Sequence, residues 1–138
     1  MKPFSELMFK DDVRYTESHE WAKESGGNVV TGVDDFSQSA LGDIVYVELP
    51  DVGADVRAGS AYGSLESTKA VSDLFAPVSG KVAKVNEALS DAPDLVNSDP
   101  FGAAWIIEIT PSDPSEFGKL MDVATYKEFA SKSEHADH

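Results

Sequence analysis

The feature that most constrains the fold of this chain is a pair of short strand-like runs that meet at one lysine, Lys69. Both runs favour extended backbone, and the second ends at Ala76-Pro77-Val78-Ser79-Gly80, a strong stop for a strand. The pattern predicts a β-hairpin that displays Lys69 to solvent. Because an amine cannot carry out redox or carbon-transfer chemistry unaided, such a display favours an attached cofactor. An ordinary solvated lysine is the alternative.

The segment before this hairpin predicts a second hairpin and a short helix. Residues 19–23 and 29–33 are strand-like and are separated by a glycine-containing turn. Asp35 stands three residues before Gln38, which is the spacing of a capping box. We therefore expect a short helix over residues 36–41, capped by Asp35.

Three further runs have strand character, at residues 43–49, 81–86 and 104–110. Between the last two, residues 89–100 are rich in Asp, Pro, Ser and Asn and predict a long loop. The run at 43–49 alternates, which predicts one face formed by Ile44, Tyr46 and Glu48 and the other by Val45, Val47 and Leu49.

The C-terminal part of the chain changes to helical signals. Asp113 precedes Pro114, a typical first helical residue, and helices are therefore expected from about residue 114. Asp122 is positioned to cap a second helix over residues 123–130. These helices look like packing elements and not like a separate domain.

The length of 138 residues fits one domain. We expect an N-terminal arm at residues 1–13, a single domain at 14–130 and a disordered tail at 131–138. The mainly β pattern, with few and short helical segments, sets the fold class.

Composition excludes several classes of function. The chain has no cysteine, so disulfides, thiolate metal sites and a cysteine nucleophile are absent, and we expect no metal site. Its net charge of −14 opposes binding to nucleic acid and to anionic membranes. No stretch has the roughly 18 apolar residues of a membrane span, and no targeting segment is evident at the N-terminus. These features predict a cytoplasmic protein, with a mature mitochondrial chain as the alternative.

Four segments, in order, resemble one family. The stretch Glu66-Ser67-Thr68-Lys69-Ala70, with the Ala76–Gly80 stop, is similar to the lipoyl attachment hairpin of the glycine cleavage system H proteins. The other three matching segments are Tyr15–Trp21, Gly32–Pro50, and Leu95–Gly102 with Trp105. The resemblance covers roughly residues 13 to 130. Thr68 and Ala70 argue against a biotinyl domain, in which methionines flank the lysine.

The resemblance implies a barrel-sandwich hybrid fold of the lipoyl/biotinyl hammerhead type, with lipoate amide-linked to Lys69. The chain would then be a carrier without an active site of its own, and the family usually works as a monomer. It would shuttle an aminomethyl group from a pyridoxal-phosphate glycine decarboxylase to a tetrahydrofolate-dependent aminomethyltransferase. Dihydrolipoyl dehydrogenase would reoxidise the arm, and a lipoate ligase or a lipoyl/octanoyl transferase would attach it.

The resemblance also implies a surface cleft that holds the loaded arm, formed by Ser18, Glu20 and Asp73. Carboxylates beside a cationic amine would stabilise it by charge and hydrogen bonding. Without the resemblance, the three would be ordinary solvated residues at strand ends. Two other functions stay open: relay of lipoate to other proteins by the same fold, and a small hydrolase that uses Asp or Glu.

Overall fold

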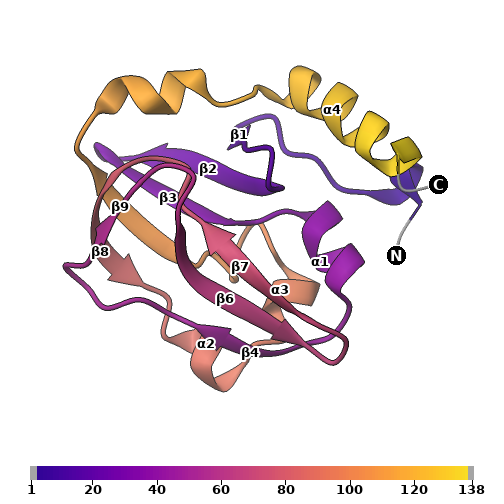
Figure 1. The fold of residues 1–138 in the computed structure, drawn as a ribbon, viewed down its shortest axis with the longest axis horizontal. Helices are drawn as coiled ribbons and strands as arrows, with labels where there is room; N and C mark the ends of the chain where they lie inside the picture. Colours follow the sequence, from indigo (N-terminus) through magenta and orange to yellow (C-terminus); the bar gives the residue numbers. More distant parts are fainter. Residues whose placement is uncertain (1–2, 137–138) are drawn as a thin grey trace.

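The computed structural model describes residues 3–136, and its strands form two antiparallel sheets with short helices around them (Figure 1). The strands are β1 (Arg14–Tyr15), β2 (Glu20–Ser25), β3 (Asn28–Val33), β4 (Ile44–Glu48), β5 (Asp55–Val56), β6 (Ala61–Ser67), β7 (Val71–Phe75), β8 (Gly80–Val85) and β9 (Ile107–Pro111). The helices are η1 (Phe4–Glu6), α1 (Asp35–Leu41), α2 (Ala88–Asp91), α3 (Leu95–Ser98), η2 (Pro114–Lys119) and α4 (Val123–Ala136). The larger sheet has the order β1-β2-β3-β9-β8-β5, and the smaller has the order β4-β6-β7.

Both predicted hairpins are confirmed. Strands β2 and β3 pair from Glu20↔Val33 to Ser25↔Asn28, and two glycines with positive φ form the turn. Strands β6 and β7 pair from Ala61↔Phe75 to Glu66↔Val71, which leaves Lys69 in the turn. The expected mainly β class is therefore correct.

The main hydrophobic core lies between the two sheets. Alternate side chains of each sheet point inward, and most of those that do are fully buried. The larger sheet contributes Val29, Val82, Ile107 and Ile109, and the smaller one contributes Val47, Leu65 and Leu74. Burial of these side chains holds the β6–β7 hairpin on a fixed base.

A second core ties the chain ends to the larger sheet. The ring of Tyr126, from α4, stacks on the ring of Tyr15 with centroids 4.2 Å apart. Leu7 and Val13, from the N-terminal arm, are buried in the same cluster. Helix α4 continues to Ala136, beyond the expected end at 130, while residues 137 and 138 of the expected tail lie outside the described residues.

Two sequence predictions near the site are wrong in detail. The cap of α1 is Asp34 and not Asp35, because the Asp34 carboxylate accepts the N–H of Ser37 at 2.8 Å. Strict alternation in β4 also fails: Val45 and Tyr46 are both exposed, because the pairing with β6 shifts between Ile44 and Tyr46.

The predicted loop at residues 89–100 instead contains α2 and α3. Each is a single turn of helix, and each buries one apolar residue, Leu89 in α2 and Val96 in α3. Burial in the core stabilises turns that are too short to signal a helix in the sequence.

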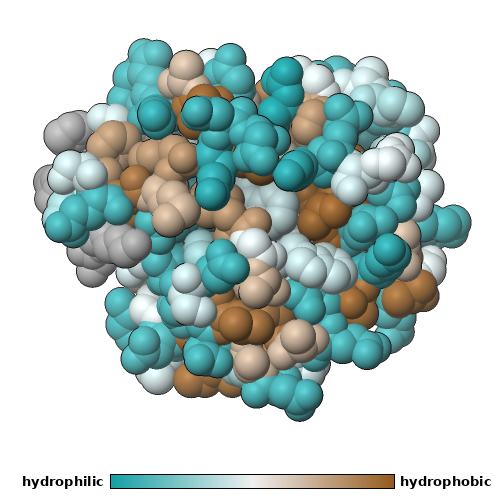
Figure 2. Space-filling view, turned by 180° about the vertical axis from the view of Figure 1, so that it is seen from behind, coloured by the Kyte–Doolittle hydropathy of each residue, from teal (hydrophilic) through white to brown (hydrophobic). Residues whose placement is uncertain are grey.

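On the face shown in Figure 2, hydrophilic side chains surround separate apolar patches. Over residues 3–136, no helix combines the length and the apolar character needed to span a bilayer.

Candidate functional site

Lys69 lies at the tip of the β6–β7 hairpin, with its side chain exposed. In Figure 1 this tip projects beside the segment that links α1 to β4, on the side of the molecule away from α4. The position predicted for Lys69 is therefore confirmed. An amine so placed is accessible to another protein.

Ser67 fixes the shape of the turn. Its hydroxyl oxygen accepts the backbone N–H groups of Lys69 and Ala70, both at 3.1 Å. The Ser67 N–H donates to the carbonyl of Ala70 at 2.8 Å. Because Ser67 is buried, these bonds are shielded from water, and the root of the lysine side chain has one backbone geometry.

The segment between α1 and β4 supports the turn from one side. The N–H of Thr68 donates to the carbonyl of Asp43 at 3.1 Å, and Nζ of Lys69 donates to the carbonyl of Ala40 at 3.4 Å. Gly42 has φ +81°, and a Cβ there would lie 3.1 Å from Cε of Lys69. Glycine therefore permits both the turn after α1 and the close approach of the lysine side chain.

Asn97 holds that support in place. Its amide nitrogen donates to the carbonyl of Gly42 at 2.8 Å and to the side chain of Gln38 at 3.0 Å. Its oxygen accepts the N–H of Ile44 at 2.9 Å. Asn97 thereby joins α3 to the end of α1 and the start of β4, next to Lys69.

A buried carboxylate lies at the other end of β7. Glu20, the first residue of β2, is only 2% exposed. One oxygen of its carboxylate accepts the Ser18 hydroxyl at 2.7 Å, and the other accepts the N–H of Phe75 at 2.7 Å. Since β7 is an edge strand of its sheet, a side chain of the larger sheet satisfies the N–H group of Phe75.

Burial controls the protonation of Glu20. Loss of hydration raises its pKa to about 8, and the hydrogen bonds from Ser18 and Phe75 offset only part of that effect. Glu20 is therefore mostly protonated at neutral pH. A cation that approached the carboxyl group would favour its ionised form.

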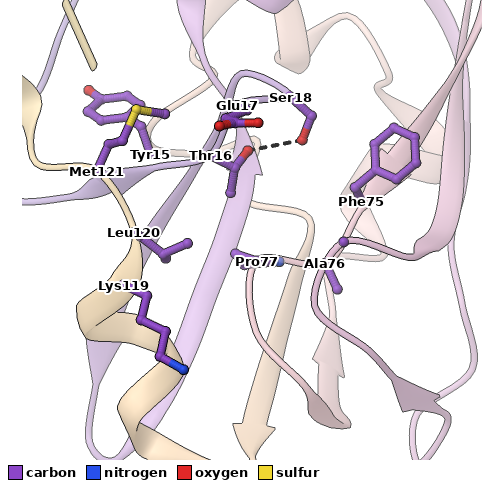
Figure 3. A pocket seen from close by; sticks show the side chains of 11 residues that line it. Tyr15, Thr16, Glu17, Ser18, Phe75, Ala76, Pro77, Lys119, Leu120 and Met121 are labelled. Atoms are coloured by element: carbon purple, nitrogen blue, oxygen red, sulfur yellow. Dashed lines mark hydrogen bonds between the residues drawn. The ribbon is translucent and has the colours of Figure 1, made fainter. Parts of the chain in front are cut away.

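A cavity of about 520 Å³ opens beside Ser18 (Figure 3). Four segments enclose it: the β1–β2 connection, the β5–β6 connection, the end of β7 and the link between η2 and α4. Its lining residues are Tyr15, Thr16, Glu17, Ser18, Gly59, Phe75, Ala76, Pro77, Lys119, Leu120 and Met121. Ser18 thus contacts both the cavity and the carboxylate of Glu20.

Asp73 is not brought into direct contact with this pair. It lies on β7 opposite Ser64, with its side chain exposed, and residues 3–136 show no hydrogen bond to its carboxylate. It is four residues from Lys69, or about 13 Å at about 3.3 Å per residue. Asp73 therefore lies along β7 between the tip and the Glu20 end.

Comparison with known proteins identifies the family of the chain. The family model for the glycine cleavage H-protein matches residues 13–133. The chain belongs to the glycine cleavage H-protein family. The glycine cleavage system H protein of Anaeromyxobacter sp. (strain K) is 56% identical over 124 residues, which are 90% of this chain and 97% of the relative. The corresponding Bacillus cytotoxicus protein is 52% identical over 126 residues, 91% of this chain and 99% of the relative.

A solved structure of an H-protein family member confirms the fold. The crystal structure of a glycine cleavage system H protein from Mycobacterium marinum superposes with a TM-score of 0.80 at 38% sequence identity. The match covers 91% of this chain and 99% of the other. The expected barrel-sandwich fold is therefore correct.

The H-protein fold of this chain contains a second buried polar cluster that its sequence did not reveal. The Tyr126 hydroxyl donates a short hydrogen bond to Asp34 and lies 2.7 Å from Nδ1 of His19. His19 has φ +65° and stacks on Phe36 with centroids 4.1 Å apart. Burial raises the pKa of Asp34 to about 7. The cluster joins α4 to the start of α1 and to the β1–β2 connection.

Other supporting residues also escaped sequence reasoning. Ser67 and Asn97 belong to the segments that resemble the family, but their bonding depends on tertiary contacts. No sequence pattern indicates the environment of Tyr62. Its hydroxyl is buried and has no hydrogen-bond partner within the described part of the chain. Burial, together with the charge of Glu20, raises the pKa of Tyr62 well above its usual value.

Proposed function

We propose that the chain carries lipoate on Lys69 and serves as the lipoyl carrier of the glycine cleavage system. The observation that supports this most strongly is an exposed lysine at the tip of a hairpin braced by a buried serine, in a chain of the H-protein family. Among residues 3–136, Nζ of Lys69 makes one long hydrogen bond, to the carbonyl of Ala40, and no ion pair, so its charge does not explain its position.

The residues around Lys69 fit an amide-linked cofactor. Lipoate bound there would supply a disulfide, which accepts the aminomethyl group of decarboxylated glycine. The chain itself would provide a rigid root for the arm through Ser67 and Asn97. Tethering raises the effective concentration of the carrier at each partner's active site. Under this proposal the chain is a carrier and not an enzyme.

The proposed partners are glycine decarboxylase, the folate-dependent aminomethyltransferase, dihydrolipoyl dehydrogenase and the enzyme that attaches lipoate. The net charge of −14 favours encounter with basic patches on these proteins. Such encounters slow as salt is added, because exposed charges are then screened.

We also assign the loaded arm to a cleft formed by Ser18, Glu20 and Asp73. Support comes from the buried Glu20 carboxyl group, which can ionise beside a cationic amine, and from Ser18, which holds it in place. Asp73 lies on the path along β7 from Lys69 toward Glu20. Its carboxylate would contribute a second negative charge to the amine.

Intact-mass measurement tests the attachment site. After co-expression with a lipoate–protein ligase, the wild-type chain should gain one lipoyl group. Lys69→Arg should gain none, while the matched control Lys81→Arg, at another exposed lysine paired with Asp55, should be modified normally. Modification of the Lys69→Arg chain would contradict the assignment.

A second experiment distinguishes glycine cleavage from lipoate relay. The lipoylated chain is mixed with purified glycine decarboxylase, and the exchange of labelled carbon dioxide into glycine is followed. We expect exchange with the lipoylated wild type and none with Lys69→Arg. Lipoylation without any exchange would favour the relay function.

A further inference from the structure

Large apolar side chains gather at the surface beside Lys69. Within residues 3–136, five large hydrophobic side chains are exposed: Met8, Val45, Tyr46, Val52 and Val71. Val45, Tyr46 and Val71, at 51%, 53% and 64% exposure, all lie on the strands at the base of the lysine turn. We call these three residues the tip patch.

Strand register places Tyr46 and Val71 on one face. Both are paired with Glu66, Tyr46 from β4 and Val71 from β7, so they flank it in one row across the sheet. The next row inward, which contains Val47 and Leu65, is buried. Because successive side chains of a strand alternate, the row of Glu66 faces solvent. Val45 joins it through the irregular pairing at the start of β4.

Apart from Lys69 itself, the charged side chains on the strands of the tip patch are all acidic. Strands β4, β6 and β7 contain Glu48, Glu66 and Asp73, and they contain no lysine or arginine. Exposed apolar side chains scattered singly need no explanation, but a group at one site marks an interaction surface. An apolar centre with an acidic rim complements a partner surface with an apolar centre and a basic rim.

We propose that the tip patch is the docking surface for the enzyme that acylates Lys69, and that this enzyme presents an apolar surface bordered by Lys or Arg. This inference rests on the proposed function. The enzyme must enclose Nζ of Lys69, which attacks the carbonyl carbon of an acyl-adenylate. A C–N bond forms, the C–O bond to adenosine monophosphate breaks, and Nζ loses a proton. Val71 is only two residues from Lys69, so an enzyme that encloses Nζ also covers the patch.

Acylation kinetics test the docking surface. The unmodified full-length chain is the substrate of a purified ATP-dependent lipoate–protein ligase, with Tyr46→Ser, Val71→Ser and the double variant compared with wild type. Val52→Ser is the matched control, because Val52 is 62% exposed and follows the end of β4 that is remote from Lys69. Tyr46→Phe keeps the ring and tests whether apolar contact suffices.

We expect the double variant to lower kcat/KM by about tenfold or more, the effect of losing one anchoring side chain. The change should be in KM, since docking is lost equally from the ground state and the transition state. Val52→Ser and Tyr46→Phe should match wild type, and all variants should show the unfolding midpoint of wild type within a few degrees.

Two outcomes would overturn the docking surface: a double variant with the wild-type kcat/KM, or an equal loss in Val52→Ser. These are distinct from failure of the proposed function. If the wild-type chain is not acylated, or Lys69→Arg still is, the lipoyl assignment itself is wrong. If Lys69 is acylated equally in the wild type and the double variant, only the docking surface is wrong.

Discussion

The carboxylate of Glu20 accepts the backbone N–H of Phe75 at 2.7 Å, and this bond joins the first residue of β2 to the last residue of β7. It crosses from the larger sheet to the smaller one. The same carboxyl group also accepts the Ser18 hydroxyl at 2.7 Å. The Glu20 side chain is 2% exposed, and neither of these two hydrogen bonds comes from a basic side chain. Ionisation of this carboxyl group therefore costs folding free energy.

The first prediction concerns stability against pH. Glu20 has a folded-state pKa of about 8 against an ordinary value of 4.5, so the folded state binds its proton more tightly. Its stabilising contribution is therefore full below about pH 4.5 and is lost as pH rises through about 8. The loss is at most about 5 kcal/mol, from 1.36 kcal/mol per pKa unit. Glu20→Gln should flatten the fall in the free energy of unfolding between pH 5 and 8.

Urea denaturation at several pH values measures this effect, and Glu24→Gln, an exposed position on the same strand, is the control. Asp34, whose pKa burial raises to about 7, should retain part of the slope in the Glu20→Gln variant. An unchanged slope in Glu20→Gln would show that the Glu20 carboxyl group does not titrate in this range.

The second prediction concerns the loaded arm. A cationic amine beside Glu20 favours the carboxylate, so binding of the amine should release a proton and strengthen as pH rises from 6 toward 8. Glu20→Gln should remove this pH dependence and release ammonia from the loaded carrier about tenfold faster or more, because a hydrogen bond to a charged group contributes about 1.5–3 kcal/mol. The rate of ammonia release, followed at several pH values, measures this effect. If Glu20→Gln leaves the rate and its pH dependence unchanged, Glu20 does not belong to the cleft.

The third prediction concerns the attachment of α4. Tyr126→Phe keeps the ring that stacks on Tyr15 but removes the donor to Asp34. A buried carboxylate then loses a partner, which should cost about 1–3 kcal/mol of unfolding free energy. Urea denaturation measures the loss, and amide hydrogen exchange should increase in α4. Tyr46→Phe, at an exposed tyrosine, is the control. If Tyr126→Phe leaves the free energy of unfolding unchanged, ring stacking alone holds α4 in place.

The fourth prediction concerns a substitution that should not lower the free energy of unfolding. The hydroxyl of Tyr62 is buried without a hydrogen-bond partner among the described residues. Tyr62→Phe removes an unsatisfied polar group and keeps the ring, so stability should stay equal or rise by about 1 kcal/mol. The same denaturation experiment measures it. A loss comparable to that of Tyr126→Phe would mean that a water molecule satisfies the hydroxyl.

The fifth prediction concerns the lysine turn. Ser67→Ala removes an acceptor for two backbone N–H groups, those of Lys69 and Ala70. We expect a loss of about 1–3 kcal/mol and faster amide exchange at both residues. Ser64→Ala, on the same strand with one bond to Glu48, is the control. If exchange at Lys69 stays slow, the turn does not depend on the serine.

Local patterns were sufficient for the elements that present Lys69. Its hairpin was predictable because strand-forming residues and a Pro–Gly stop act over a few neighbouring positions. The exact cap of α1 was not, since Asp34 and Asp35 are equally good caps in sequence and only their partners distinguish them: Asp34 accepts the N–H of Ser37, whereas Asp35 accepts the N–H of Met8. The exposure of both Val45 and Tyr46 was also missed, because a shift in pairing depends on the partner strand β6.

The sequence by itself determined that a lysine stands between two strands, because turn and strand preferences are properties of adjacent residues. Only the tertiary structure decided that Glu20 is buried and bonded to Phe75, 55 residues away. Ser18 and Glu20 carry the polar side chains typical of exposed strand ends. Their protonation and bonding arise from the packing of one sheet against the other, and that arrangement depends on the whole chain.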